Sequence, residues 1–278
     1  MKQMRPVYSS IMASALLLSA CDGDRTRIAG NTGTAAPDTT VVDTVAQAVD
    51  TVMPPAAADG LFDDFVYSFM HNKHFQLQRI KFPLHNTIDG HDTPIDKTRW
   101  RHDPLYVHKD TYTILFDNER SMRNEKDTSI HHVTVEWIYL DKGRVKQYHF
   151  SKEHGKWMLT AIDSHALAQN ANSDFFKFYH RFSTEPSYQL AHIDNPFKFK
   201  TYDSDTFQEI DGVLDAAQWP DFRPAMPAHV ITNIDYGQRY APDGRRVLVI
   251  TSPSAGMSCT LSFQKRRGTW KLTGMKSI

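Results

Sequence analysis

The sequence predicts an α+β fold built from two tandem repeats, each with helices packed on a curved antiparallel sheet. Two long segments of the chain resemble each other at a constant spacing, which is typical of a duplicated domain. Each copy begins with apolar residues at helical spacing and ends with apolar residues that alternate as in strands. Helices followed by hairpin-linked strands favour a sheet with its helices on one face.

The duplication is visible as identities between residues 113 positions apart. At the start of the copies, Phe62, Phe65, Phe69, Gln76, Leu77, Ile80 and Pro83 correspond to Phe175, Phe178, Phe182, Gln189, Leu190, Ile193 and Pro196. At the end, Gly143, Phe150, Lys152, Gly155, Trp157, Leu159 and Thr160 correspond to Gly256, Phe263, Lys265, Gly268, Trp270, Leu272 and Thr273. The middles, about residues 84–130 and 197–243, differ between the copies.

Each copy is expected to open with helix. Phe62, Phe65 and Phe69 form one apolar face, and Asp59 is placed to cap the helix that carries them. A second short helical piece, about residues 75–81, is expected to end before Pro83, because proline disfavours helix in the residue that precedes it.

Strands are expected downstream, where the apolar period changes to two. In the first copy they lie near residues 133–140, 144–152 and 156–162, and turns containing glycine separate them. In the second copy they lie near residues 246–252, 257–265 and 269–276. The two repeats are predicted to span residues 60–165 and 172–278.

The amino terminus predicts a lipoprotein. Lys2 and Arg5 precede an apolar stretch, residues 11–18, which has the length of a signal-peptide core and is too short to span a bilayer. Leu18-Ser19-Ala20-Cys21 follows and resembles a lipobox, so residues 1–20 are interpreted as the leader and Cys21 as the lipidation site. An ordinary signal peptide with an incidental cysteine is the alternative.

Residues 21–59 are interpreted as the lipidated cysteine and a disordered stalk. Residues 22–59 contain no aromatic side chain and carry six Asp against two Arg, so they cannot bury enough apolar surface to fold. The remaining residues 60–278 carry 28 basic and 26 acidic side chains, which implies no nucleic-acid partner. The expected location is the bacterial outer membrane, with the periplasmic or surface face left open.

The lipobox, the acidic stalk and two copies of an aromatic helix with a closing Gly-x-Trp-x-Leu-Thr strand resemble the bacterial lipoproteins of the domain-of-unknown-function 4348 family. The resemblance implies a helix and curved-sheet module similar to nuclear transport factor 2, present twice. It implies no activity, since that superfold includes both isomerases and binding domains.

The favoured function is a non-catalytic binding or scaffold module without a cofactor. Tryptophan and tyrosine combine apolar area with a polar group, which suits them to a groove, although a core position is the alternative for each. The expected ligand is an envelope glycan, a peptide or a protein, because no glycine-rich phosphate loop is present. The candidate binding residues are Trp100, His102, Asp103, Tyr106, Trp137, Trp219, Phe222 and Arg223.

The alternative is an isomerase or dehydratase with an Asp or His base in one of the two modules. The candidates for that base are His102, Asp103, His108 and Asp110. Eleven of the fourteen histidines lie between His71 and His165, but they form no recognised metal motif, so no metal is predicted. Cys259, in a predicted strand, is interpreted as a core residue and not as a nucleophile.

Overall fold

The computed structural model describes residues 59–277, except residues 204, 207, 242–243 and 253–255. The predicted leader and the lipidation site Cys21 lie outside the described residues, as does the stalk up to residue 58. Asp59 is therefore the first residue whose contacts can be given.

The first repeat begins with two short helices and continues mainly as strands. The helices are α1 (Phe62–His71) and α2 (Lys73–Gln78), and a 3₁₀ segment, η1 (Glu119–Lys126), lies between the third and fourth strands. The strands are β1 (Ile80–Ile88), β2 (His91–Asp92), β3 (Tyr112–Phe116), β4 (His132–Tyr139), β5 (Arg144–Glu153) and β6 (Lys156–Ala166).

The second repeat follows η2 (Leu167–Gln169) and again has two helices followed by six strands, but its further helical segments lie between the second and third strands. Its helical segments are α3 (Ser173–Thr184), α4 (Pro186–Ala191), η3 (Ala216–Gln218) and α5 (Trp219–Phe222). Its strands are β7 (Ile193–Tyr202), β8 (Glu209–Leu214), β9 (Val230–Asp235), β10 (Arg245–Ser252), β11 (Met257–Arg266) and β12 (Thr269–Ser277). The predicted α+β class is confirmed.

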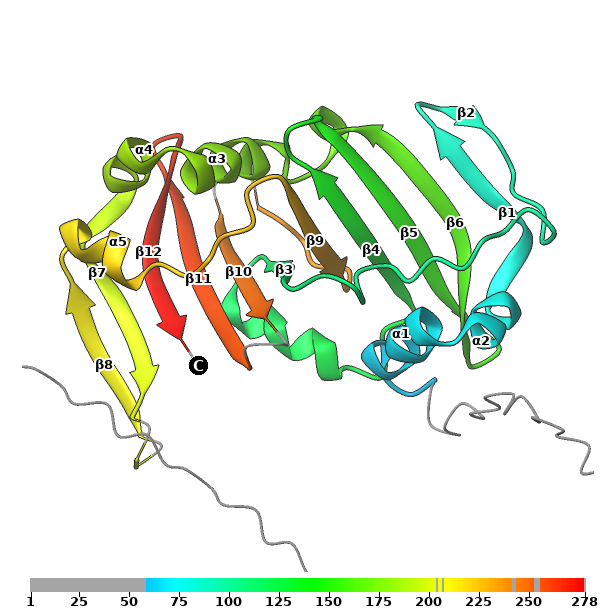
Figure 1. Ribbon diagram of the computed structural model, residues 1–278, viewed down its shortest axis with the longest axis horizontal. Coiled ribbons are helices and arrows are strands. Elements are labelled where there is room, and N and C mark those ends of the chain that lie inside the picture. The colour runs from blue at the N-terminus through cyan, green and yellow to red at the C-terminus, as the bar shows by residue number, and fades with distance from the viewer. Residues whose placement is uncertain (1–58, 204, 207, 242–243, 253–255, 278) are drawn as a thin grey trace, which may run out of the picture. The chain divides into compact units, whose positions relative to one another are not determined.

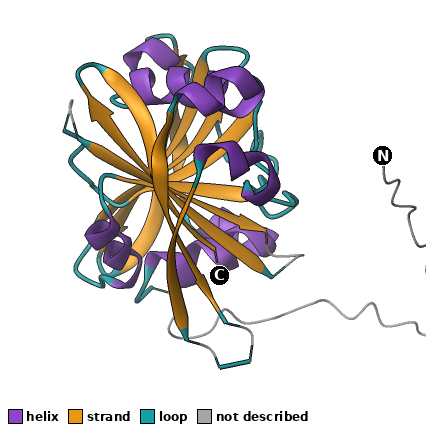
Figure 2. Cartoon of the chain, turned by 90° about the vertical axis from the view of Figure 1, so that its left-hand side faces the viewer, coloured by secondary structure: helices purple, strands orange, loops and turns teal. Residues whose placement is uncertain are grey.

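The strands form two six-stranded sheets, in the orders β2-β1-β6-β5-β4-β9 and β3-β10-β11-β12-β7-β8. Figure 1 shows α1 and α2 at the lower edge of the molecule and α3 and α4 at the upper edge, and Figure 2 shows the helices beside the curved strands. Most neighbours are antiparallel, as expected, but β1 runs parallel to β6 and β7 runs parallel to β12. Parallel pairing is possible here because a long stretch of chain separates the two strands of each pair.

Each sheet contains one strand from the other repeat. Strand β9 of the second repeat pairs with β4, with Val135 opposite Ile234, and β3 of the first repeat pairs with β10, with Leu115 opposite Leu248. The exchanged strands meet at Thr113 and Thr232. Each threonine hydroxyl accepts a hydrogen bond from the backbone N–H of the other residue and donates one to its carbonyl. The sheets therefore cross the sequence limits of the repeats.

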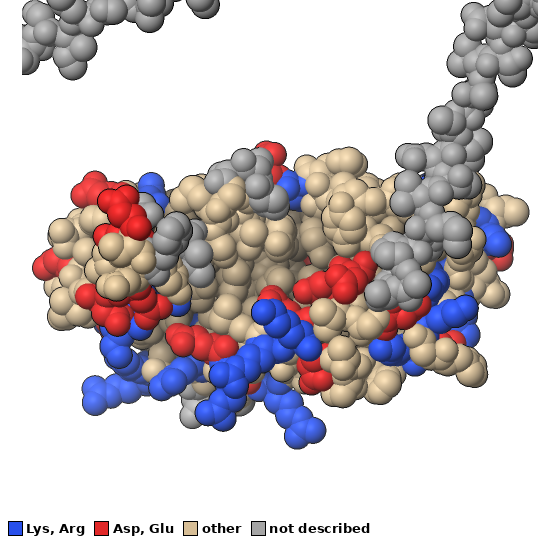
Figure 3. Space-filling view, turned by 90° about the horizontal axis from the view of Figure 1, so that it is seen from below, with Lys and Arg blue, Asp and Glu red and all other residues tan. Residues whose placement is uncertain are grey.

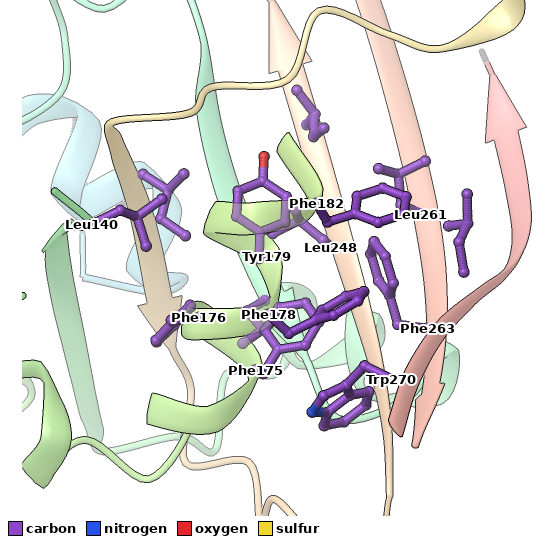
Figure 4. Close-up of a cluster of buried hydrophobic side chains, with 14 of the residues drawn as sticks. Leu140, Phe175, Phe176, Phe178, Tyr179, Phe182, Leu248, Leu261, Phe263 and Trp270 are labelled. Atoms are coloured by element: carbon purple, nitrogen blue, oxygen red, sulfur yellow. The ribbon is translucent and has the colours of Figure 1, made fainter. Parts of the chain in front are cut away.

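Equivalent aromatic residues make equivalent contacts in the cores of the two repeats. Phe62 packs edge-on against Trp157 with ring centroids 5.1 Å apart, and the equivalent Phe175 and Trp270 are 5.2 Å apart. Phe65 and Phe150 are separated by 5.7 Å, as are their counterparts Phe178 and Phe263. Figure 4 shows the second of these clusters, with the α3 rings facing Phe263 and Trp270. The predicted correspondence at an offset of 113 is thus confirmed.

Two predictions about the start of the first repeat are wrong. Asp59 does not cap α1, whose N-cap is Leu61. The Asp59 carboxylate instead binds the Arg79 guanidinium at 2.7 and 2.8 Å and accepts a hydrogen bond from the backbone N–H of Trp157 at 2.9 Å. The second helix ends at Gln78, and Pro83, whose preceding peptide bond is cis, lies inside β1. The strand begins early because Ile80 is buried and pairs with Leu159 of β6.

Candidate functional site: a pocket beside helix α1

A pocket of about 490 Å³ lies along the side of α1 that faces away from Phe150 and Trp157. The other walls come from the segment between β2 and β3, from η1 and from the exchanged strand β9, so both repeats contribute to it. Its lining residues are Asp63, Val66, Tyr67, Met70, His71, Tyr106, Val107, Lys109, Tyr112, Ile114, Glu125 and Ile234. We call it the α1 pocket; its volume falls in the range of small-molecule sites.

Asp63 places a carboxylate in this pocket, and the second repeat holds it in position. The hydroxyl of Tyr236, in the residue that follows β9, donates a hydrogen bond to Asp63 Oδ1 at 2.6 Å. The Tyr236 ring in turn stacks on Phe116 with centroids 6.4 Å apart. Burial raises the pKa of Asp63, and the bond from Tyr236 offsets part of that shift.

Glu125, in η1, places a second carboxylate in the pocket. Burial, with a contribution from the nearby Asp63, raises its pKa to about 7. Among the described residues no side chain or backbone group forms a hydrogen bond or ion pair with Glu125. Its oxygens are not among the enclosed atoms that lack a partner, so they reach the solvent-accessible space of the pocket, where they are available to a ligand.

Several other polar residues of the pocket contact the backbone or neighbouring rings. His71 Nδ1 lies 2.7 Å from the Tyr67 carbonyl, and the two rings are in contact. Tyr106 and Tyr112 pack with ring centroids 5.6 Å apart, and burial raises the pKa of Tyr106. Lys109 Nζ lies 5.4 Å from the centre of the Trp137 ring. Glu125 is therefore the carboxylate of the lining that no described group binds.

The equivalent place in the second repeat is occupied by aromatic side chains. At an offset of 113, Asp63 corresponds to Phe176 and Val66 to Tyr179, and both aromatic residues are fully buried. Figure 4 shows their rings projecting from α3 into the core cluster. The Tyr179 hydroxyl donates to the Pro227 carbonyl at 3.0 Å. Asp63 and Val66 of the pocket are therefore replaced by two buried aromatic residues in the second repeat.

The two predicted site tryptophans in the middle segments are held by equivalent core glutamines. Trp100 Nε1 donates to Gln76 at 3.0 Å, and Trp219 Nε1 donates to Gln189 at 3.1 Å. Trp219 has no exposed surface, and Trp100 is half-buried. Their polar groups are used inside the fold, which places Trp219 out of reach of a ligand.

Asp103 and His102 also lie away from the α1 pocket. Asp103 accepts a hydrogen bond from the Tyr148 hydroxyl at 2.5 Å, and its backbone N–H and carbonyl bind the Gln76 amide. The Nε2 atom of the half-buried His102 is enclosed without a hydrogen-bond partner among the described residues. The structure thus does not bring these two residues to a common cavity with Asp63.

The other predicted site residues are scattered. Tyr106 lines the α1 pocket, and Trp137 stacks on Tyr139 beside the pocket residue Lys109. Phe222 is 44% exposed and packs on Phe199, and Arg223 donates to Gln189 at 3.2 Å, both on the second repeat. His108 and Asp110, proposed as bases, are exposed.

Asp63 and Glu125 were not among the predicted site residues. A signal for Asp63 was present in the duplication, because this charged residue corresponds to the phenylalanine Phe176 in the second copy. Glu125 lies in a middle segment that has no aligned counterpart, so no pattern singled it out among the many charged residues nearby.

A smaller hollow of about 160 Å³ lies near Glu136, Asn170 and Tyr240. The buried Glu136 carboxylate accepts hydrogen bonds from Gln147 at 2.8 Å, Asn170 at 2.9 Å and Asn233 at 2.7 Å. Because three amide groups already satisfy this carboxylate, the hollow is a weaker candidate than the α1 pocket.

Other kinds of site find little support in the described part of the chain. It contains no group of three or more His, Cys, Asp or Glu side chains placed to hold a metal ion. Its helices are all too short or too polar to cross a bilayer. Figure 3 shows basic side chains gathered along one edge with acidic ones beside them, so neither sign of charge covers that face. Cys259 is buried as predicted, and burial raises its pKa to about 12.

Comparisons with known proteins agree with this architecture. The family model described as a domain of unknown function, DUF4348, matches residues 41–277. A crystal structure of a protein from Bacteroides fragilis NCTC 9343, described as similar to nuclear transport factor 2, is 37% identical and covers 80% of this chain and 98% of that one, with a TM-score of 0.73. No curated protein matches the chain.

Proposed function

This chain belongs to the family described as domain of unknown function DUF4348, and from that premise we propose that it is a lipid-anchored binding protein of the bacterial cell envelope. The lipid is attached at Cys21, the anchor lies in the outer membrane, and residues 59–278 hold a small ligand in the α1 pocket without converting it. This ligand is smaller than the glycan, peptide or protein partner expected from the aromatic residues.

The observation that carries the binding proposal is the difference between the repeats at two positions of α1 and α3, helices that share their three core phenylalanines. Phe176 and Tyr179 fill the second module, whereas Asp63 and Val66 leave about 490 Å³ open in the first. Apolar side chains that line an open pocket stay in contact with water, which costs stability relative to burying them. The second repeat has two buried aromatic side chains at the equivalent positions, so the space kept open in the first repeat supports a use for it.

The pocket function is tested by giving the first repeat a residue of the second repeat, with tyrosine at position 66 as at Tyr179. The soluble chain carrying Cys21→Ser should bind the neutral probe 4-phenylbutanol in isothermal titration calorimetry, and Val66→Tyr should weaken that binding at least tenfold by filling the pocket. Asp64→Phe is the matched control, since Asp64 is exposed on the same helix. Binding that is absent in the parent, or that survives Val66→Tyr in a folded variant, would contradict the proposed pocket function.

The anchor is tested separately. The parent chain should incorporate a palmitate analogue and sediment with membranes, and Cys21→Ser should release it, because several acyl chains at one cysteine provide the only proposed attachment. A Cys21→Ser chain that still sediments, together with a parent that takes up no label, would remove the lipoprotein part of the proposal.

A second candidate function rests on Glu125. A carboxylate with a pKa of about 7 in an apolar pocket has the properties of a general base for abstracting a proton beside a carbonyl group. In D₂O, an enzyme of this kind would accelerate deuterium exchange at the carbons beside the carbonyl of 4-phenyl-2-butanone, and Glu125→Gln would abolish the acceleration. If the protein only binds its ligand, deuterium exchange of the ketone should proceed at the rate measured in buffer alone.

A further inference from the structure

We infer that the ligand of the α1 pocket has an apolar body and one ammonium group, and that Glu125 is the partner of that ammonium. This inference rests on the proposed binding function and specifies the ligand's chemistry. It uses three observations: the apolar walls, the unpartnered carboxylate and the balance of charges around the pocket.

The walls determine the body of the ligand. Apolar side chains and tyrosine rings make up most of the lining, namely Val66, Met70, Tyr106, Val107, Tyr112, Ile114 and Ile234. A sugar or another ligand with many hydroxyl groups would leave most of them without hydrogen bonds against such walls, at a cost for each group. A hydrocarbon or aromatic body instead gains from every apolar contact.

The two carboxylates determine the charged group. Asp63 accepts the Tyr236 hydroxyl at Oδ1 and is held in place by it, whereas Glu125 has no partner in the described part of the chain. An ionised carboxylate in a partly buried site is stabilised by a cation at hydrogen-bond distance. An ammonium group offers three donors, so it can bind Glu125 and still reach Asp63.

The surrounding charges favour a cation over an anion. The ionisable groups that face or adjoin the pocket are Asp63, Tyr67, His71, Tyr106, Lys109, Tyr112, Glu125, Lys126 and Tyr236. Lys109 lies over the Trp137 ring and forms no ion pair with either carboxylate among the described residues. A ligand carboxylate would meet the two carboxyl groups Asp63 and Glu125, against Lys109 as the one lysine among the described lining residues.

Three probes of one size test the inference: 4-phenylbutylamine, 4-phenylbutanol and 4-phenylbutyrate, titrated at pH 8 into the chain carrying Cys21→Ser. The amine should bind at least tenfold more tightly than the alcohol, and the carboxylate more weakly than both. Glu125→Gln should abolish the preference for the amine over the alcohol. Asp64→Asn removes an exposed carboxylate from α1 and should change none of the three.

The pH dependence provides a second readout. Because Glu125 ionises near pH 7, amine affinity should rise between pH 6 and pH 8 in the parent and stay constant in Glu125→Gln. Equal affinities for amine and alcohol, or an amine preference that persists in Glu125→Gln, would overturn the inference while the pocket function stands. Failure of the alcohol to bind the parent would instead contradict the pocket function.

Discussion

At the scale of the residue, Asp63 and Glu125 work against the stability of the fold that holds them. Both carboxyl groups have raised pKa values, and burial is the largest cause in each case. The second repeat places Phe176 where the first has Asp63, which shows that an apolar side chain suits that position of the helix. The first repeat therefore gives up core packing at a position where its duplicate keeps it.

The pH dependence of stability should reveal the cost of Glu125. Its pKa is raised from an ordinary 4.5 to about 7, so the stability contributed by the protonated form is present below pH 4.5 and lost as the pH rises through 7. Glu125→Gln should therefore stabilise the protein above pH 7, by about 1 kcal/mol after allowance for solvent access, and make little difference at pH 4.

Urea unfolding of Glu125→Gln and the parent at pH 4, 6 and 8 measures this difference, and Asp64→Asn controls for loss of a surface charge. A Glu125→Gln variant that is less stable than the parent at pH 8 would mean that the carboxylate is stabilised in the folded state by a group that lies outside the contacts described.

Residue patterns predicted the core of this protein well and its candidate site poorly. Phe65, Trp157 and Trp270 repeat with their surroundings, so their burial follows from the duplication. Trp100 and Trp219 combine an apolar ring with one donor, and the sequence does not reveal that Gln76 and Gln189 bind that donor inside the fold. Contacts between residues far apart in sequence decide which aromatic side chains remain available.

At the scale of the element, the exchanged strands β3 and β9 hold the two sheets together. Thr113 and Thr232 are 119 positions apart instead of 113, so the second copy has six more residues before this strand than the first. That shift explains why the middles do not align at the main offset and why neither strand was predicted. The strands near residues 133–162 and 246–276 were predicted within a few residues, because their offset is constant.

Replacing either threonine at the crossing should destabilise the fold by a similar amount. Thr113→Val keeps the shape of the side chain but leaves the backbone N–H and carbonyl of Thr232 unpaired in the core, which costs about 1–3 kcal/mol. Thr232→Val does the same to Thr113. Thr98→Val, at an exposed position, should stay within about 0.5 kcal/mol of the parent.

Urea unfolding midpoints of the three variants provide the measurement. If Thr113→Val is as stable as Thr98→Val, the reciprocal hydrogen bonds contribute nothing, and the sheets are held together by packing alone.

At the scale of the whole molecule, the exchange makes each repeat incomplete. The sheet that holds β1, β4, β5 and β6 ends in a strand of the second repeat, and Tyr236 of that repeat positions Asp63. The duplication in the sequence predicted two modules. It could not predict that β3 and β9 change places, because either of these apolar strands could pair with the edge of either sheet.

Separately produced halves should therefore depend on each other. Residues 59–171 and 172–278 alone should expose the edges of β4 and β10 and self-associate or aggregate. Mixed during refolding, they should form a one-to-one complex with one cooperative melting transition. Size-exclusion chromatography with light scattering and circular dichroism measure this; a monomeric half with its own cooperative transition, unchanged by its partner, would contradict the expectation.

The contacts of Asp59 determine how a mechanical load would enter this fold. For a chain held to a membrane through its amino-terminal segment, as proposed, tension arrives at Asp59, four residues before Asp63. The Asp59 carboxylate is bound to Arg79 and to the Trp157 N–H of β6. Because β6 lies between β1 and β5 inside its sheet, the pull is transferred to hydrogen-bonded strands and not to α1. A load that reached Asp59 would therefore bypass the helix that lines the pocket.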